Sequence, residues 1–413
     1  MKIIHQKIVA VLFGGLAAIP LTGFAFNSGS DGSFGAINFT NNSTTPLTNT
    51  LALPPDGIFN CTSINIGTNC YVNFVPNALN TPVYLLAQSN IVVAGIIDVS
   101  GQAGATNGSF PTIPGPGGFA GGAGGNPSAG IPAGYGQGPG FGGGNTSQAS
   151  GGSFGTVGGQ TGYQNGTTYG NLLLVPLIGG SGGGGLTGNG NTIPGASGGA
   201  GGGALILASS TSVVETGNIL ARGGSGFYDQ NNFSGCGSGG GVRIVAPLVS
   251  LSGTIDVSGG TNSVNAAYGG NGRVRFDTAS AINANVIGNG QGHPSAPIVS
   301  YGRSFFVFPP ATPQLYFLTA AGTSIPVGTT NAVSVALPSG SPASQVVTLF
   351  GTNFLGTVPV QIVATPATGT PFTTNIVLNF PTTNSFVQTN VTINVPSGIP
   401  TQLNAYANYY VQP

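Results

Sequence analysis

Glycine constrains this chain more than any other residue: 75 of the 413 positions are glycine and 30 are proline, a content that excludes long α-helices. Forty of the glycines fall in residues 101–203, in runs such as "GGAGGNPSAGIPAGYGQGPGFGGG". The runs have no strict Gly-X-Y period, so a collagen helix is excluded. Two interpretations stay open: a flexible low-complexity insert, or extended three-fold helices that pack closely because glycine lacks a side chain. The aromatic residues between the runs favour packing.

A second feature is a repeat centred on three glycines. The segments "IVVAGIIDVSG" (91–101), "VVETGNILARG" (213–223) and "VSLSGTIDVSG" (249–259) align without gaps on Gly95, Gly217 and Gly253. Each follows another apolar strand, "VYLLA", "ALILA" or "VRIVA". The 36 residues from Gly217 to Gly253 are a period typical of solenoids.

Alternation within each repeat assigns its faces. In "GIIDVSG", Ile97 and Val99 share one side of a strand, and Asp98 lies on the other. We therefore predict an all-β chain in which residues 26–305 form a right-handed parallel β-helix with apolar residues inside. The long glycine-rich insert would occupy about 101–203. The predicted outward polar face carries Asp98, Arg222 and Asp256.

The composition changes after residue 305, where glycine becomes scarcer and Thr, Val, Asn and Pro increase. Segments such as "QVVTLFGTNF", "VPVQIVAT" and "VQTNVTINV" indicate six or seven strands separated by turn residues. We expect residues 306–413 to form an immunoglobulin-like or fibronectin-like β-sandwich.

The first 25 residues have the pattern of a signal peptide. Lys2 and Lys7 precede an apolar run that is too short to span a membrane, and "GFA" fits a cleavage site after Ala25. We expect export and no transmembrane segment after cleavage. The remaining chain has five arginines, seven acidic residues and one histidine. Without clustered Lys and Arg, nucleic acid is not an expected partner.

The chain has three cysteines. In an exported protein Cys61 and Cys70, in "FNCTSINIGTNCYVNF", are candidates for a disulfide that joins adjacent strands. Cys236 would then be an unpaired thiol. No CxxC pair indicates zinc.

Asp98 and Asp256 raise the question of a glycosidase-like carboxylate pair. If the repeats stack as consecutive rungs, the two carboxylates lie two rungs apart, or about 9.6 Å, near the upper limit for inverting glycosidases. However, Leu220 replaces aspartate on the middle rung, and Arg222 is placed to pair with both acids. We therefore favour a structural role and expect no catalytic residue.

The remaining polar residues give weaker signals. Asp31 and Asp229 resemble fragments of calcium loops but have no second carboxylate nearby, so we interpret both as surface turns. Arg273 and Arg275 alternate along one strand and should both point outward, and His293 lies in a loop. No cofactor or metal is expected.

Taken together, "LPPDGIFNCTSINIG", "GIIDVSGQ", "GGGVRIVA", the glycine runs and the leader resemble exported glycine-rich β-helix proteins of Gram-negative bacteria. They are more loosely similar to the glycine-rich passengers of bacterial adhesins. This resemblance implies a secreted or cell-surface structural protein and transfers no catalytic residue.

The expected function is therefore non-enzymatic: an adhesive or matrix element whose partners are copies of itself, as an oligomer or filament, a surface polysaccharide or a host surface. The alternative is a β-helix protein that binds or degrades polysaccharide. A weaker alternative, a flat ice-binding face, finds no regular Thr-x-Thr ladder in support.

Overall fold

The structure is a computed structural model, and the predicted leader (1–25) and His293 lie outside the residues that it describes. It describes residues 26–106, 108–161, 166–188, 195–229, 232–262, 267–288, 295–308, 313–327, 333–382 and 385–407. These residues are almost entirely strands and extended segments, with one short 3-10 helix at Pro127–Ala129. The predicted all-β class is confirmed.

Two parallel sheets enclose the first core. One sheet has six strands in the order β17-β15-β10-β7-β4-β2: Val286–Ile287, Thr254–Asp256, Asn218–Leu220, Ile96–Asp98, Cys70–Val75 and Leu47–Ala52. The other follows the path β14-β9-β6-β3-β5-β8-β13-β16-β18: Leu248–Leu251, Ser212–Glu215, Ile91–Val93, Ile58–Ile66, Val83–Ala87, Ala204–Ser209, Gly241–Val245, Arg273–Asp277 and Ile298–Gly302. β1 (Gly35–Phe39) also pairs with β3.

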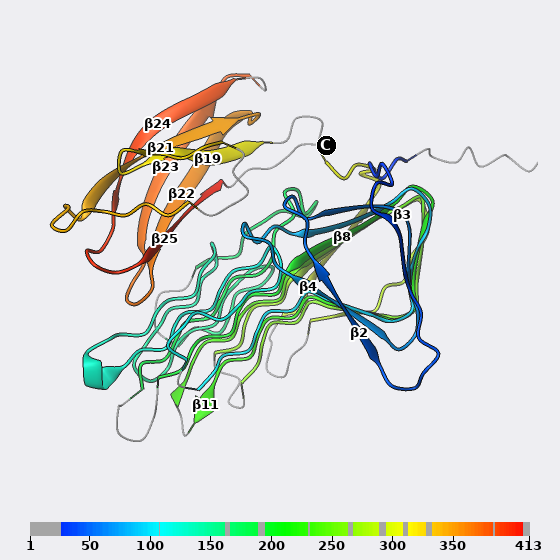
Figure 1. The fold of residues 1–413 in the computed structure, drawn as a ribbon, viewed down its shortest axis with the longest axis horizontal. Coiled ribbons are helices and arrows are strands. Elements are labelled where there is room, and N and C mark those ends of the chain that lie inside the picture. The colour runs from blue at the N-terminus through cyan, green and yellow to red at the C-terminus, as the bar shows by residue number, and fades with distance from the viewer. Residues whose placement is uncertain are drawn as a thin grey trace, which may run out of the picture.

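The larger sheet curls sharply at β3. The first half of β3 pairs with β5, and its second half pairs with β6. The two arms of this sheet and the six-stranded sheet therefore form three walls, seen as the triangular outline at the right of Figure 1. We call these strands and their shared core the prism.

The repeat found in the sequence sets the register of the prism. Ile219 pairs with Ile97 on one side and with Ile255 on the other, and all three are buried in the core. The repeat glycines stack at the preceding corner: a Cβ on Gly217 would overlap the Gly95 carbonyl, and one on Gly253 would overlap the Gly217 carbonyl. Only glycine allows this stacking.

The chain leaves the prism repeatedly at one corner. After β7, β10 and β15 it continues into the glycine-rich segments 99–203, 221–240 and 257–272, and each time it returns to the next strand of the larger sheet. The described residues of these segments lie together as the extended chains at the left of Figure 1, and we call them the glycine bundle. A short hairpin, β11 (Tyr228–Asp229) and β12 (Asn232–Phe233), lies among them.

Hydrogen bonds in the glycine bundle repeat every third residue. In segment 196–204, the N–H groups of residues 197, 200 and 203 donate to the carbonyls of 105, 102 and 99. Those of residues 198, 201 and 204 donate to 122, 119 and 116, and those of 199 and 202 donate to 235 and 238. Three directions and a three-residue repeat are the geometry of a three-fold extended helix. Of the two interpretations of the glycine runs, the packed one is therefore correct.

The C-terminal part is a two-sheet sandwich. One sheet has the order β20-β19-β21-β24 (Thr323–Ser324, Gln314–Ala320, Ser344–Thr352 and Phe386–Asn394), and the other has β23-β22-β25 (Phe372–Phe380, Gly356–Pro366 and Thr401–Ala407). All strand pairs are antiparallel. The inner residues of both sheets, among them Val347, Leu349, Ile362 and Leu378, form a separate apolar core.

A glycine in the middle of the bundle should not tolerate a side chain. A Cβ on Gly199 would overlap the Gly224 carbonyl, and backbone held by hydrogen bonds on several sides cannot move away. We expect Gly199→Ala to lower the free energy of unfolding by more than about 3 kcal/mol, measured by chemical denaturation.

The matched control is Gly130→Ala, because Gly130 also lies in a glycine-rich segment but has open space around its Cα. Its positive φ of 68° limits the expected cost to about 1 kcal/mol. Equal costs for the two variants would contradict the close packing described above.

Candidate functional site

Asp98 and Asp256 mark the points where the chain leaves the prism. Asp98 ends β7 and accepts a hydrogen bond from the Ser100 N–H (2.7 Å), and Asp256 ends β15 and accepts one from the Ser258 N–H (3.0 Å). A side-chain oxygen bonded to the N–H two residues later is an Asx turn, which stops a strand. The shared "IDVSG" sequence is therefore explained as a strand-to-bundle turn.

Arg222 reaches only one of the two carboxylates. Its Nε donates to Asp256 Oδ2 at 2.6 Å, whereas Asp98 Oδ2 accepts a hydrogen bond from the Tyr71 hydroxyl. Leu220 lies between the acids, as expected from the sequence. The predicted outward polar face is not open to solvent at Asp256, which is only 6% exposed because Arg222 and Ser258 cover it. These contacts leave neither carboxylate as a member of a facing pair.

The predicted disulfide is absent, since Cys61 and Cys70 are free, buried thiols. Cys61 lies in β3 and Cys70 in β4, and these strands belong to different sheets and do not pair with each other. The physical reason is the corner between them, which turns the chain from one wall of the prism to the next. Burial raises the pKa of Cys61 and of Cys236 to about 12, so these thiols stay protonated and unreactive at neutral pH.

A buried ion cluster lies outside the core of the prism. Arg243 contacts Asp277 Oδ2 at 2.9 Å, and Arg275 contacts Asp277 Oδ1 at 2.7 Å. The Ser304 N–H donates a further bond to Asp277. Arg273 donates to the Tyr169 carbonyl and lies over the Phe154 ring. These arginines do point outward from their strands, but the glycine bundle and residues 304–307 cover them.

Removing the shared carboxylate should strongly destabilise the fold. In Asp277→Asn, two buried guanidinium groups lose their counter-ion, so we expect the free energy of unfolding to fall by about 3–5 kcal/mol in a denaturation experiment. Arg222→Gln breaks a pair whose arginine side chain is 50% exposed, and should cost at most about 1 kcal/mol. A similar small loss in both variants would show that the cluster is not a stabilising element.

Glu215 is the most perturbed carboxyl group in the prism. It ends β9, is 1% exposed, and lies against the backbone of Gly253 and Thr254. Burial raises its pKa from the ordinary 4.5 to about 7. The folded protein therefore holds a proton on Glu215 at pH values where the unfolded chain has released it.

This proton makes stability depend on pH in a defined direction. The contribution of Glu215 is fully present below pH 4.5 and is lost as the pH rises through about 7, a change of about 3 kcal/mol. Urea denaturation of wild type and Glu215→Gln across pH 4.5–8 should show the wild type losing that amount relative to the variant. A constant difference between the two proteins would contradict the assignment.

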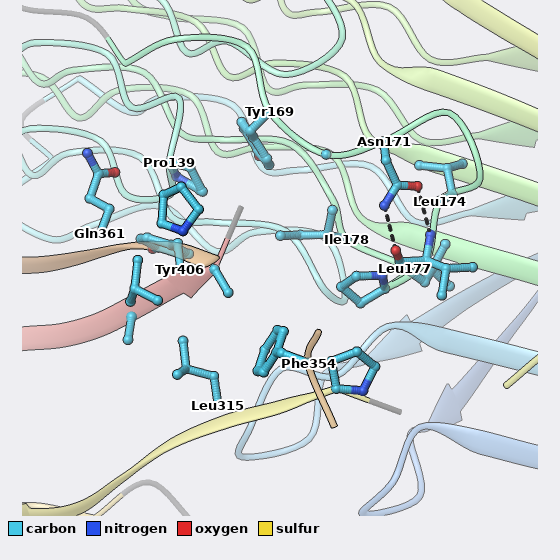
Figure 2. A pocket seen from close by; sticks show the side chains of 18 of the residues that line it. Pro139, Tyr169, Asn171, Leu174, Leu177, Ile178, Leu315, Phe354, Gln361 and Tyr406 are labelled. Atoms are coloured by element: carbon cyan, nitrogen blue, oxygen red, sulfur yellow. Dashed lines mark hydrogen bonds between the residues drawn. The ribbon is translucent and has the colours of Figure 1, made fainter. Parts of the chain in front are cut away.

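A candidate binding site is an apolar cleft between the sandwich, the glycine bundle and one wall of the prism. Its volume is about 640 Å³, within the range of small-molecule sites. Figure 2 shows Tyr169, Leu177 and Ile178 on the bundle side, facing Phe354 and Tyr406 of the sandwich. The sandwich is held there by a ring contact between Phe119 and Tyr406 and by a hydrogen bond from the Gly369 N–H to the Ala133 carbonyl.

The polar side chains that line the cleft include three tyrosines and Arg243. The Tyr169 hydroxyl donates to the Gly179 carbonyl and accepts from Ser181. Burial raises the pKa of Tyr169 and Tyr406, and that of Tyr84 to about 12, so these phenols are neutral. Arg243 is committed to Asp277. Among the described residues that line this cleft there is no carboxylate, histidine, lysine or cysteine.

Sequence reasoning missed this cleft. Its walls come from segments more than two hundred residues apart, such as Tyr169 and Tyr406, and no local pattern shows that they meet. The apolar stretch "NLLLVPLIGG" (171–180) was the only signal, since an exposed linker would not need those side chains.

Comparisons with protein families, with characterised proteins and with solved structures give no match. The part of the chain that the structure describes includes no cluster of three or more metal-ligating side chains and no helix long and apolar enough to cross a membrane. The function must therefore be inferred from the molecule itself.

Proposed function

We propose that this protein is a non-enzymatic, exported surface protein of a Gram-negative bacterium that acts as an adhesive or structural element. The proposal includes a finer assignment of the fold: the prism is a right-handed parallel β-helix, and the sandwich is immunoglobulin-like. In this arrangement the prism and the glycine bundle form a rigid support, and the sandwich is the part presented to a partner.

The observation that carries the proposal is how the few charged groups are used. Asp98 and Asp256 close the turns at which the chain leaves the prism, and Asp277 neutralises two arginines behind one of its walls. These groups hold the scaffold together, and those that line a pocket lie apart: Arg243 lines the cleft, and Asp98 lines a separate pocket beside Tyr71. A scaffold that uses its ionisable side chains in this way suits a structural role.

The sandwich supports an adhesive role through its orientation. Its sheet β23-β22-β25 supplies the residues that face the cleft, including Gln361, Asn375 and Tyr406. The outer surface of its other sheet, which carries β24, lies away from the glycine bundle (Figure 1). Phe386 of β24 is 68% exposed on this sheet and is open to a partner. End-to-end assembly through the unpaired edges of the prism stays a prediction.

The proposal predicts a location and a phenotype. Protease added to intact cells of the native bacterium should degrade the protein, and deletion of its gene should reduce attachment to surfaces, measured as adhering cells after washing. Re-expression should restore attachment. If the protein in intact cells resists the added protease because it lies inside the cell, the proposal is wrong.

A second experiment separates adhesion from the polysaccharide-degrading alternative. The double variant Asp98→Asn, Asp256→Asn keeps the turn-forming side-chain oxygens but removes both charges. It should restore attachment as well as the wild-type gene, at equal amounts of surface protein. Loss of attachment, together with loss of a depolymerising activity found in the wild type, would favour the enzyme.

A further inference from the structure

The outward sheet of the sandwich carries a row of stacked aromatic rings. Tyr316 of β19, Phe350 of β21 and Phe386 of β24 lie on three adjacent strands. The ring centroids are 5.0 Å apart for Tyr316 and Phe350 and 5.7 Å apart for Phe350 and Phe386, and both pairs are stacked. Phe386 is 68% exposed, and the other two rings are half-buried. A soluble sheet would normally keep such rings inside.

The register explains the row. Tyr316 lies directly opposite Phe350, and Phe386 lies opposite Thr352, so that it is the diagonal neighbour of Phe350. Residues on either side of each ring, such as Leu349 and Val387, point into the sandwich core. The three rings therefore share the outer face and cross the strands, which spaces them by about 4.8 Å per strand.

Polar side chains form a second row beside the rings. Thr319 Oγ1 and Thr348 Oγ1 are 2.7 Å apart, and Thr348 donates to Asn390 Oδ1 at 2.8 Å. Asn390 and Gln388 are exposed. Thr348 is only 8% exposed, so the exposed amides of Gln388 and Asn390 are the groups beside the rings that offer hydrogen bonds to a ligand.

Charge defines the kind of partner that fits. From residue 304 to the C-terminus the sequence has no Asp, Glu, Lys, Arg or His. The sandwich therefore has no side-chain charge with which to attract or orient an ionic ligand, and a charged partner would lose solvation without compensation. A neutral polysaccharide matches both rows, since the C–H faces of its sugar rings stack on aromatic rings and its hydroxyls bond to amides.

From these observations we propose that the outer face of the β20-β19-β21-β24 sheet binds a neutral polysaccharide chain, with Tyr316, Phe350 and Phe386 as the stacking platform. The chain would run across the strands, since the three rings span about 10 Å in that direction. This inference rests on the proposed adhesive function and names its partner class.

The test is affinity electrophoresis of the full chain through gels that contain dextran, soluble starch, galactomannan or hydroxyethyl cellulose, with alginate as a polyanionic comparison. We expect at least one neutral polysaccharide to retard the wild type. The double variant Phe350→Thr, Phe386→Thr should weaken this binding at least tenfold, because threonine keeps the strand but removes the rings. Retardation by alginate alone, or by none of the polymers, would overturn the proposal.

Phe372→Thr is the matched control, because Phe372 is also an exposed phenylalanine of the sandwich (41%) but lies on the other sheet. It should leave polysaccharide binding unchanged, and thermal melting should show that all variants are folded.

If the folded double variant binds polysaccharide as well as the wild type does, the three rings are not the binding platform. If cells that carry the double variant still attach, the adhesive function stands and polysaccharide is not its partner. If the wild-type protein binds polysaccharide but is not exposed on the cell surface, only the adhesive function is wrong.

Discussion

The rest of this structure depends on backbone hydrogen bonds between extended glycine segments. An ordinary domain buries apolar side chains to offset the loss of chain entropy, but the bundle has few side chains to bury. In place of them it brings backbones into contact, and each turn of segment 196–204 donates hydrogen bonds to three different neighbours. A Cβ at Gly199, Gly201 or Gly237 would overlap a neighbouring carbonyl, so glycine is required by the packing as well as by the conformation.

The prism and the bundle are coupled through one repeated corner. The chain enters the bundle after β7, β10 and β15 of the six-stranded sheet; Asp98 and Asp256 form the turn at the first and third of these exits, and Leu220 takes their place at the second. The bundle then returns it to the larger sheet, one strand further along. The period of the prism therefore fixes the spacing of the bundle segments that leave it. This explains why inserts as different in length as 99–203 and 221–240 can belong to the same architecture.

Local patterns were sufficient for the parts of the fold that repeat. Alternation placed Ile97 and Ile255 inside, and the structure shows that the three aligned repeats are neighbouring strands, β7, β10 and β15, as was supposed for the carboxylate distance. The disulfide failed because spacing in sequence cannot show that Cys61 and Cys70 lie on different walls of the prism. The burial of Arg243 and Arg275 could not be predicted from the sequence either, since the residues that cover these side chains come from other segments. The cleft and the aromatic row depend on such long-range placement, and their residues are not adjacent in the sequence.

The charged side chains are distributed unevenly between the prism with its bundle and the sandwich. Where the chain leaves the prism or covers one of its walls, single carboxylates and guanidiniums fix the geometry, because backbone and apolar contacts there would not specify a unique arrangement. The sandwich needs no such help, since its two sheets have an apolar core of their own. It can therefore be free of charged side chains and still fold, which leaves its outer face neutral. If this face binds a neutral polysaccharide as proposed, the affinity should be nearly independent of ionic strength, because no side-chain charge takes part.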